Sequence, residues 1–232
     1  EGKLPRGRRV ATSDDLEVSA YLEIAEGRAS EAENEPQSVN EGIIVIDFGS
    51  QYSHLIARRI RELKVYSEVF TASSTWETVR HINPKGVILS GGPASVYDPG
   101  APRIPDWVFE RDLPVLGICY GMQALVHQLG GEVVPGQLQE YGSAVLHQDG
   151  GEASLFKELP PTFQVWMSHG DRIATLPPGF SSLAYTENSP VAALGNGNGM
   201  FGLQFHPEVN HTPLGQSILE NFLVRTCDCR QS

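Results

Sequence analysis

The pattern of hydrophobic and polar positions changes near residue 41. From Gly42 onward, short continuous runs of apolar residues alternate with segments whose apolar residues recur every three or four positions. The continuous runs predict strands buried on both faces, and the wider spacing predicts helices that pack one face against them. Because strands and helices alternate with short connections, the pattern predicts a doubly wound, mostly parallel α/β sheet.

The first half of this region contains the clearest elements. The expected strands are residues 43–48, 65–70, 86–90 and 114–118, and the expected helices are residues 51–63, 75–82, 104–111 and 120–129. Beyond residue 131 the apolar runs shorten and are separated by Gly, Pro and Asn, which favours a few antiparallel additions to the parallel core. These are residues 144–147, 163–167, 191–194 and 200–205, followed by a last helix from 212 or 213 to 225.

Residues 1–41 have a different character. They hold ten acidic and five basic residues, and their apolar residues are scattered. We therefore expect residues 1–41 to be an acidic, disordered extension, with one short amphipathic helix at most over 16–25, and residues 42–232 to be the folded domain. The small basic cluster at residues 3–9 is expected to be part of a solvated tail, because the acidic residues after it do not fit a transit peptide.

Composition narrows the class of protein. The 232 residues carry a formal net charge of −11, with 40% hydrophobic and 19% charged residues, which excludes a fully disordered chain. No apolar run approaches the roughly 18 residues that a membrane span needs. Such an acidic chain repels phosphate backbones, so neither nucleic acid nor a membrane is an expected partner. Only three cysteines are present, which favours a reducing, cytoplasmic location.

The strongest chemical signal is Gly117-Ile118-Cys119-Tyr120-Gly121, between an expected strand and an expected helix. This is the nucleophile-elbow pattern in the setting that it requires, since two glycines permit the sharp turn. The helix that begins there directs its positive dipole end at Cys119 and favours the thiolate. The alternative is a structural cysteine buried in a tight turn.

A thiolate nucleophile needs a proton shuttle and a group that orients the shuttle. His206-Pro207-Glu208 follows an expected strand, and Pro207 restricts the backbone of His206. Glu208 is placed to accept a hydrogen bond from the second ring nitrogen. Taken alone, this tripeptide fits a surface loop better than a catalytic pair.

Other polar groups are expected at the same edge of the sheet, where open α/β sheets bind ligands. The turn Ser90-Gly91-Gly92-Pro93 follows a strand, and main-chain N–H groups near Gly92 and at Tyr120 are candidate oxyanion donors. Gln123 lies one helical turn after the cysteine. Ser168, His169 and Asp171 are expected in one tight loop, as a substrate site or as a simple turn. Cys227-x-Cys229 is too closely spaced for a zinc site and has no partner pair, so no metal is expected.

Together these motifs closely resemble the class I (triad-type) glutamine amidotransferases, from about Gly42 to the end of the chain. The resemblance rests on Gly-Ile-Cys119-Tyr-Gly-Met-Gln123, Ser-Gly-Gly-Pro and His206-Pro-Glu208. It implies a Cys119, His206 and Glu208 triad that hydrolyses glutamine, with Gln123, Ser168, His169 and Asp171 as substrate contacts. Within the family, residues 46–52, 166–171 and 204–209 are most similar to the glutaminase domains of GMP synthetases.

This branch implies that ammonia passes to an ATP-pyrophosphatase domain or subunit, which aminates XMP to GMP. No cofactor is expected for glutamine hydrolysis, and ATP and Mg²⁺ are expected only in that partner. The sequence stops at Ser232 without such a domain, and residues 1–41 are additional to the family's usual start, so only the glutaminase half of the activity is expected here. The alternatives are a glutaminase or γ-glutamyl hydrolase of another branch, and a regulatory glutaminase-like subunit.

Overall fold

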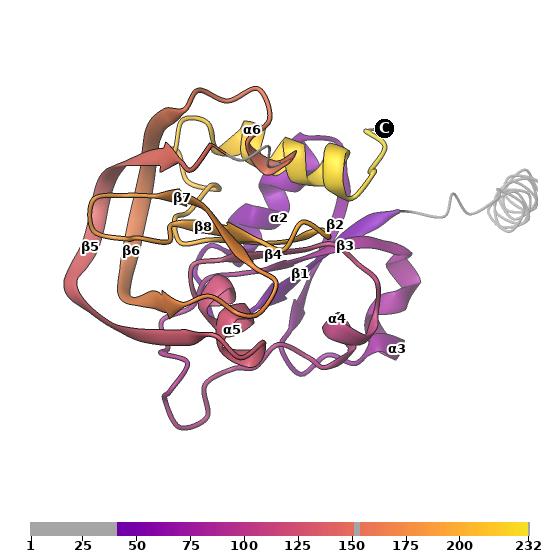
Figure 1. The fold of residues 1–232 in the computed structure, drawn as a ribbon. Helices are drawn as coiled ribbons and strands as arrows, with labels where there is room; N and C mark the ends of the chain where they lie inside the picture. Colours follow the sequence, from indigo (N-terminus) through magenta and orange to yellow (C-terminus); the bar gives the residue numbers. More distant parts are fainter. Residues whose placement is uncertain (1–40, 151–153, 232) are drawn as a thin grey trace, which may run out of the picture. The chain divides into compact units, whose positions relative to one another are not determined.

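A computed structural model describes residues 41–150 and 154–231, which fold around a nine-stranded sheet (Figure 1). The sheet order is β2-β1-β3-β4-β9-β8-β7-β5-β6. The expected acidic extension covers residues 1–41. All of it except its last residue, Glu41, lies outside the described residues. None of the described helices is long and apolar enough to cross a membrane.

One half of the sheet is parallel. Its strands pair in the order β2-β1-β3-β4-β9, and all four of these pairings are parallel. The runs of Val, Ile and Leu in β1, β3 and β4 are almost wholly buried because helices cover both faces. The predicted α/β fold is confirmed. The bounds are β1 (Gly42–Asp47), β2 (Tyr66–Thr71), β3 (Pro84–Leu89), β4 (Val115–Ile118) and β9 (Met200–Leu203).

Helices cover the two faces of this parallel half (Figure 1). Buried residues of α2 and α6 share one apolar core with one side of the sheet, and those of α3, α4 and α5 share another. The arrangement leaves the carboxyl ends of β1, β3, β4 and β9 side by side at one edge. The helices are α2 (Ser53–Glu62), α3 (Trp76–Val79), α4 (Trp107–Glu110), α5 (Tyr120–Gln128) and α6 (Gly215–Glu220), the last continued by a π-helix over Asn221–Thr226.

The other half of the sheet is antiparallel and is more extensive than expected. It consists of β5 (Glu132–Gln148), β6 (Thr162–Thr175), β7 (Ser181–Tyr185) and β8 (Ala193–Gly195). The sequence pattern predicted only the end of β5 (144–147) and the beginning of β6 (163–167), and it missed β7. Pro135 and Gly136 interrupt the strand pattern of β5 in the sequence. They lie where the pairing of β5 with β6 shifts register, between Pro135 and Glu140.

One expectation about this half is wrong. Ser168, His169 and Asp171 do not lie in a tight loop after a strand, because β6 continues to Thr175 and contains all three. Tyr141 on β5 pairs with Ser168, and Glu140 pairs with His169. The polar residues that suggested a turn are instead side chains of a strand that passes alongside the carboxyl edge of the parallel half.

Candidate active site

Cys119 occupies a strained turn between β4 and α5. Its φ of 52° and ψ of −108° are unusual for a residue with a side chain, and such strain concentrates at functional sites. Its main-chain N–H donates to Leu203 O at the end of β9, 2.7 Å away. Close packing explains the flanking glycines, since a Cβ on Gly121 would lie 2.4 Å from Leu89 O, and one on Gly117 would lie 2.7 Å from Gly121.

His206 and Glu208 form a buried pair beside this turn. Nδ1 of His206 lies 2.7 Å from Oε1 of Glu208, and the two residues are 4% and 1% exposed. Because a carboxylate can only accept, Nδ1 carries the proton of this bond, and Nε2 remains for the sulfur. A methyl group on Gly91 would lie 3.2 Å from Cε1 of His206 and 3.6 Å from Cβ of Cys119, so both side chains converge on the same small space.

This environment determines the charge of His206. Burial alone lowers the pKa of the imidazole, but hydrogen bonds with Cys119 and Glu208, together with the charges of these two residues, outweigh burial and raise its pKa to about 10. His206 is therefore an imidazolium at neutral pH. The second oxygen of Glu208, Oε2, has no hydrogen-bond partner, so the adjacent imidazolium compensates the charge of this buried carboxylate.

This shift predicts a pH dependence of stability. The pKa of His206 in the folded chain lies above its value in the unfolded chain. Protonation of His206 therefore contributes fully to the free energy of unfolding below about pH 6.5, and this contribution is lost as the pH rises through about 10. We expect the free-energy difference between wild type and His206→Asn to shrink by a few kcal/mol over this window. Urea unfolding at pH 6.5, 8 and 10 measures it, and a difference that stays constant with pH would contradict the shift.

The backbone around His206 is held from both sides. Its N–H donates to Trp166 O of β6 (3.0 Å), and Thr212 Oγ1 donates to His206 O (2.7 Å) while accepting from Trp166 N. Arg59 of α2 donates from Nε to Glu208 O at 3.0 Å. Sequence reasoning missed Thr212 and Arg59, because an arginine on a partly exposed helix face and a threonine after a strand carry no signal of their own.

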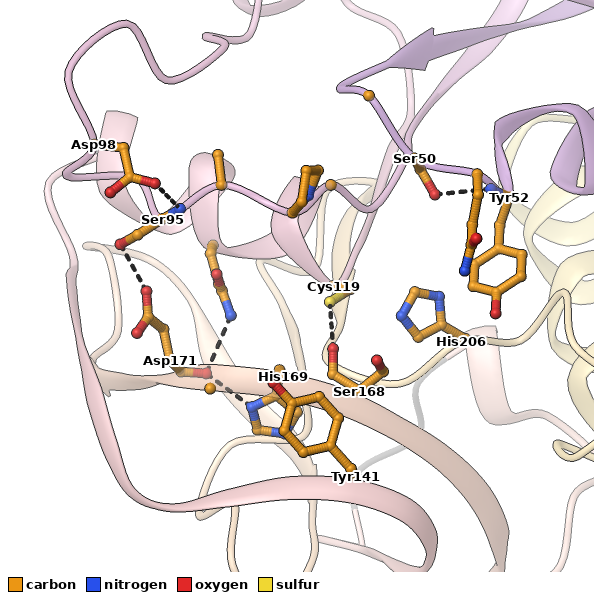
Figure 2. A pocket seen from close by; sticks show the side chains of 17 residues that line it. Ser50, Tyr52, Ser95, Asp98, Cys119, Tyr141, Ser168, His169, Asp171 and His206 are labelled. Atoms are coloured by element: carbon orange, nitrogen blue, oxygen red, sulfur yellow. Dashed lines mark hydrogen bonds between the residues drawn. The ribbon is translucent and has the colours of Figure 1, made fainter.

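A cavity of about 680 Å³ opens over the sulfur (Figure 2). Residues at the carboxyl ends of β1, β3, β4 and β9, and residues of β5 and β6, line the cavity. Most of the site residues predicted from the sequence line it, and the other two, Tyr120 and Glu208, adjoin Cys119 and His206. The lining residues are Gly49, Ser50, Gln51, Tyr52, Gly92, Pro93, Ala94, Ser95, Asp98, Cys119, Gln123, Tyr141, Ser168, His169, Gly170, Asp171 and His206.

The two candidate oxyanion donors flank the cysteine. Gly92 lines the cavity, and a Cβ there would lie 2.6 Å from Phe48 O, so the turn after β3 packs directly on the end of β1. Tyr120 is the first residue of α5, and its hydroxyl donates to Pro102 O at 2.6 Å, away from the sulfur. Only the main chain of Tyr120 is therefore placed beside Cys119. That main-chain N–H groups near Gly92 and at Tyr120 stabilise an oxyanion stays a prediction.

The β6 side of the cavity holds the remaining candidates. The carbonyl oxygen of Ser168 lies 3.6 Å from Sγ of Cys119. Gln123 donates from Nε2 to Asp171 O at 3.1 Å. Oδ2 of Asp171 accepts from Ser95 Oγ at 2.7 Å, as Figure 2 shows. Both ring nitrogens of His169 bond to protein groups, Nδ1 to Asp171 O and Nε2 to Glu140. Binding of substrate by these residues stays a prediction.

Comparison with known proteins agrees with this geometry. The family described as "Glutamine amidotransferase class-I" matches residues 44–226. The chain therefore belongs to the class I glutamine amidotransferases, as its motifs predicted, and the match includes every candidate catalytic residue.

Its curated relatives include enzymes named GMP synthase [glutamine-hydrolyzing]. That of Dehalococcoides mccartyi (strain ATCC BAA-2266 / KCTC 15142 / 195) is 56% identical over 197 residues, covering 85% of this chain and 37% of the relative. That of Thermomicrobium roseum is 55% identical over 189 residues, covering 82% of this chain and 36% of the relative. The chain thus spans little more than a third of the length of these relatives.

Solved structures give the same result for the fold. A GMP synthase component from Thermoplasma acidophilum aligns with a TM-score of 0.73 at 28% identity, covering 81% of this chain and 94% of that one. A glutamine amidotransferase of Thermotoga maritima aligns with a TM-score of 0.67 at 19% identity, covering 82% and 99%. The second likeness concerns the fold alone.

Proposed function

We propose that this chain hydrolyses L-glutamine to L-glutamate and ammonia through Cys119, His206 and Glu208. The observation that carries the proposal is one cavity in which a cysteine on a strained turn meets a buried His–Glu pair. The geometry provides a nucleophile, a proton shuttle and an orienting group.

The chemistry follows from this arrangement. His206 takes the proton of the Cys119 thiol, and the sulfur attacks the side-chain amide carbon of glutamine. The carbonyl oxygen becomes an oxyanion, held by main-chain N–H groups near Gly92 and at Tyr120. His206 donates its proton to the departing nitrogen, so ammonia leaves and a γ-glutamyl thioester remains on the sulfur. Neutral His206 then removes a proton from water, which attacks the thioester and releases glutamate.

Charge in the cavity supports an amino-acid substrate. Asp98 and Asp171 line it, and Ser95 connects the two carboxylates. The N–H of Ser95 donates to Asp98 Oδ2 and its hydroxyl donates to Asp171 Oδ2, each at 2.7 Å. Carboxylates in this position attract the α-ammonium group of glutamine. Gln123, Ser168 and His169 complete this side of the site.

The destination of the ammonia is inferred from the relatives. Since their name is GMP synthase [glutamine-hydrolyzing] and this chain spans little more than a third of them, we assign the acceptor to an ATP-pyrophosphatase domain or subunit that converts XMP to GMP. ATP and Mg²⁺ belong to that partner, and glutamine hydrolysis itself needs no cofactor. The free, buried cysteines support a cytoplasmic location.

The test is ammonia release from glutamine by the purified chain, with acid quenching to trap the thioester. We expect a γ-glutamyl adduct on the Cys119 peptide by mass spectrometry, and neither adduct nor ammonia from Cys119→Ala. The assay is repeated with the synthetase part, XMP, ATP and Mg²⁺, since glutaminases of this family are often latent alone.

Two outcomes would redirect the proposal. Faster cleavage of γ-glutamyl peptides than of free glutamine would indicate a γ-glutamyl hydrolase. Full glutamine-dependent amination with Cys119→Ala would contradict the triad and would indicate a regulatory subunit.

A further inference from the structure

A cluster of buried polar side chains lies at the β6 side of the cavity, and all of its members except His169 are outside the proposed chemistry. It consists of Glu140 on β5, His169 on β6, and Thr186 and Ser189 after β7. These residues are 7%, 7%, 3% and 1% exposed. Buried carboxylates are rare unless they are paired, so this one needs an explanation.

Glu140 is the acceptor at the centre of the cluster. Its carboxylate accepts from Thr186 Oγ1 (3.0 Å) and Ser189 Oγ (2.8 Å), and it faces Nε2 of His169 at 3.3 Å. Burial raises the pKa of Glu140, but the bonds from His169, Ser189 and Thr186 outweigh burial and hold its pKa below the usual value. The group is thus a buried, charged and well-anchored acceptor.

His169 connects Glu140 to the cavity wall, because its ring contacts Glu140 on one side and Asp171 on the other. Nδ1 lies 2.8 Å from the carbonyl oxygen of Asp171, which can only accept, so Nδ1 donates. Nε2 points the other way, toward Glu140, and the two contacts fix the plane of the ring. The same Asp171 carbonyl accepts from Gln123 Nε2 at 3.1 Å, so β5 and α5 hold one point of β6 between them.

The segment held in this way contacts the sulfur and lines the cavity. Ser168, directly before His169, places its carbonyl oxygen 3.6 Å from Sγ of Cys119. Asp171, two residues later, presents its carboxylate to Ser95 in the cavity. A small rotation of the His169 ring would displace both contacts.

We propose that Glu140 is a positioning residue that acts through His169 to hold residues 168–171 against Cys119, and so sets the affinity for glutamine. The inference rests on the proposed function, because that segment forms the substrate wall of the cavity. Glu140 itself does not line the cavity.

The chain offers variants that separate the two contacts of His169. The amide nitrogen of Asn superimposes on Nδ1 of His, and that of Gln superimposes on Nε2. His169→Asn therefore keeps a nitrogen facing Asp171 O, and His169→Gln keeps a nitrogen facing Glu140. Glu140→Gln removes the charge at constant size. The matched control is Glu132→Gln, at the exposed start of β5, whose carboxylate also accepts a bond from β6, from Thr175 Oγ1 at 3.1 Å.

Steady-state kinetics with glutamine give the first readout. We expect Glu140→Gln, His169→Gln and His169→Asn each to raise KM about tenfold with kcat within about threefold of wild type, because each breaks one link of the same path. In the His169→Asn background, Glu140→Gln should add less than about a twofold change, because the path through the ring is already broken. Equal effects of Glu140→Gln in both backgrounds, or in Glu140→Gln and Glu132→Gln, would overturn the proposal.

A second readout does not need turnover. Iodoacetamide alkylation of Cys119, followed by peptide mapping that separates it from the buried Cys227 and Cys229, reports how closely residues 168–171 cover the sulfur. We expect at least about a threefold acceleration in Glu140→Gln and His169→Gln, and none in Glu132→Gln. If wild type failed to hydrolyse glutamine even with the synthetase part, XMP, ATP and Mg²⁺, the proposed function would fail, while unchanged alkylation would overturn the role of Glu140 independently.

Discussion

Replacement of His206 by Asn is expected to lower the rate of glutamine hydrolysis by at least about 10⁴-fold while the chain remains folded. The amide nitrogen of Asn takes the place of Nδ1 and keeps a donor for Oε1 of Glu208, which lies 2.7 Å from Nδ1 in wild type. The buried carboxylate therefore keeps its partner. Nothing replaces Nε2, so the sulfur loses its proton acceptor and the leaving ammonia loses its acid.

The measurement is ammonia release at saturating glutamine, with the melting temperature recorded for each variant. His81→Asn is the matched control, because His81 also pairs with a glutamate, Glu68 at 3.2 Å, on an exposed surface. We expect this control to keep wild-type activity. A His206→Asn rate within about tenfold of wild type, with the fold intact, would remove His206 from the role of proton shuttle.

Replacement of Gly121 by Ala is expected to lower the free energy of unfolding by at least about 3 kcal/mol and the melting temperature by roughly 6–12 °C. The added Cβ would lie 2.4 Å from Leu89 O and 2.8 Å from Leu89 C, which are main-chain atoms of a central strand. α5 cannot move away without moving Cys119, which directly precedes it, and β3 is held between β1 and β4. Activity should fall in the molecules that remain folded, because the elbow is displaced.

Thermal and urea unfolding test this expectation. Gly100→Ala is the control, since Gly100 has a φ of +78° and no atom within 4 Å of an added Cβ. That variant measures left-handed backbone strain alone, which costs about 1 kcal/mol. If the two variants lost equal stability, the close approach of α5 to β3 would not be what requires glycine at residue 121.

The parallel half of the sheet was predictable because its central strands, β1, β3 and β4, are largely buried on both faces. Runs such as residues 43–48 are apolar throughout, and the helices between them repeat at the right spacing. The same regularity placed Cys119 and His206 at strand ends, where side chains from distant parts of the chain meet. Their separation of 87 residues was therefore no obstacle to proposing that they act together.

The antiparallel half was less predictable for a physical reason. β5 has one exposed face and contains Pro135 and Gly136, so its pattern is broken where the strand bulges. Polar partners inside the fold are also invisible to local patterns. In the sequence, Glu140 has the character of a surface residue. Its burial depends on partners far along the chain, because His169 and Thr186 lie 29 and 46 residues away. The role of Arg59 depends likewise on a contact across 149 residues.

The position of β9 has a consequence for the order of assembly. This strand is the last of the described strands in sequence, yet it lies inside the sheet, between β4 and β8. Leu203 at its end holds the main chain of Cys119, and His206 follows directly. A nascent chain that has not yet supplied β9 therefore has a nucleophile without a base and a sheet with an open gap. Formation of the site must await a contact of long sequence separation, which is a slow step in folding, so the proposed function predicts that unfinished chains release no ammonia.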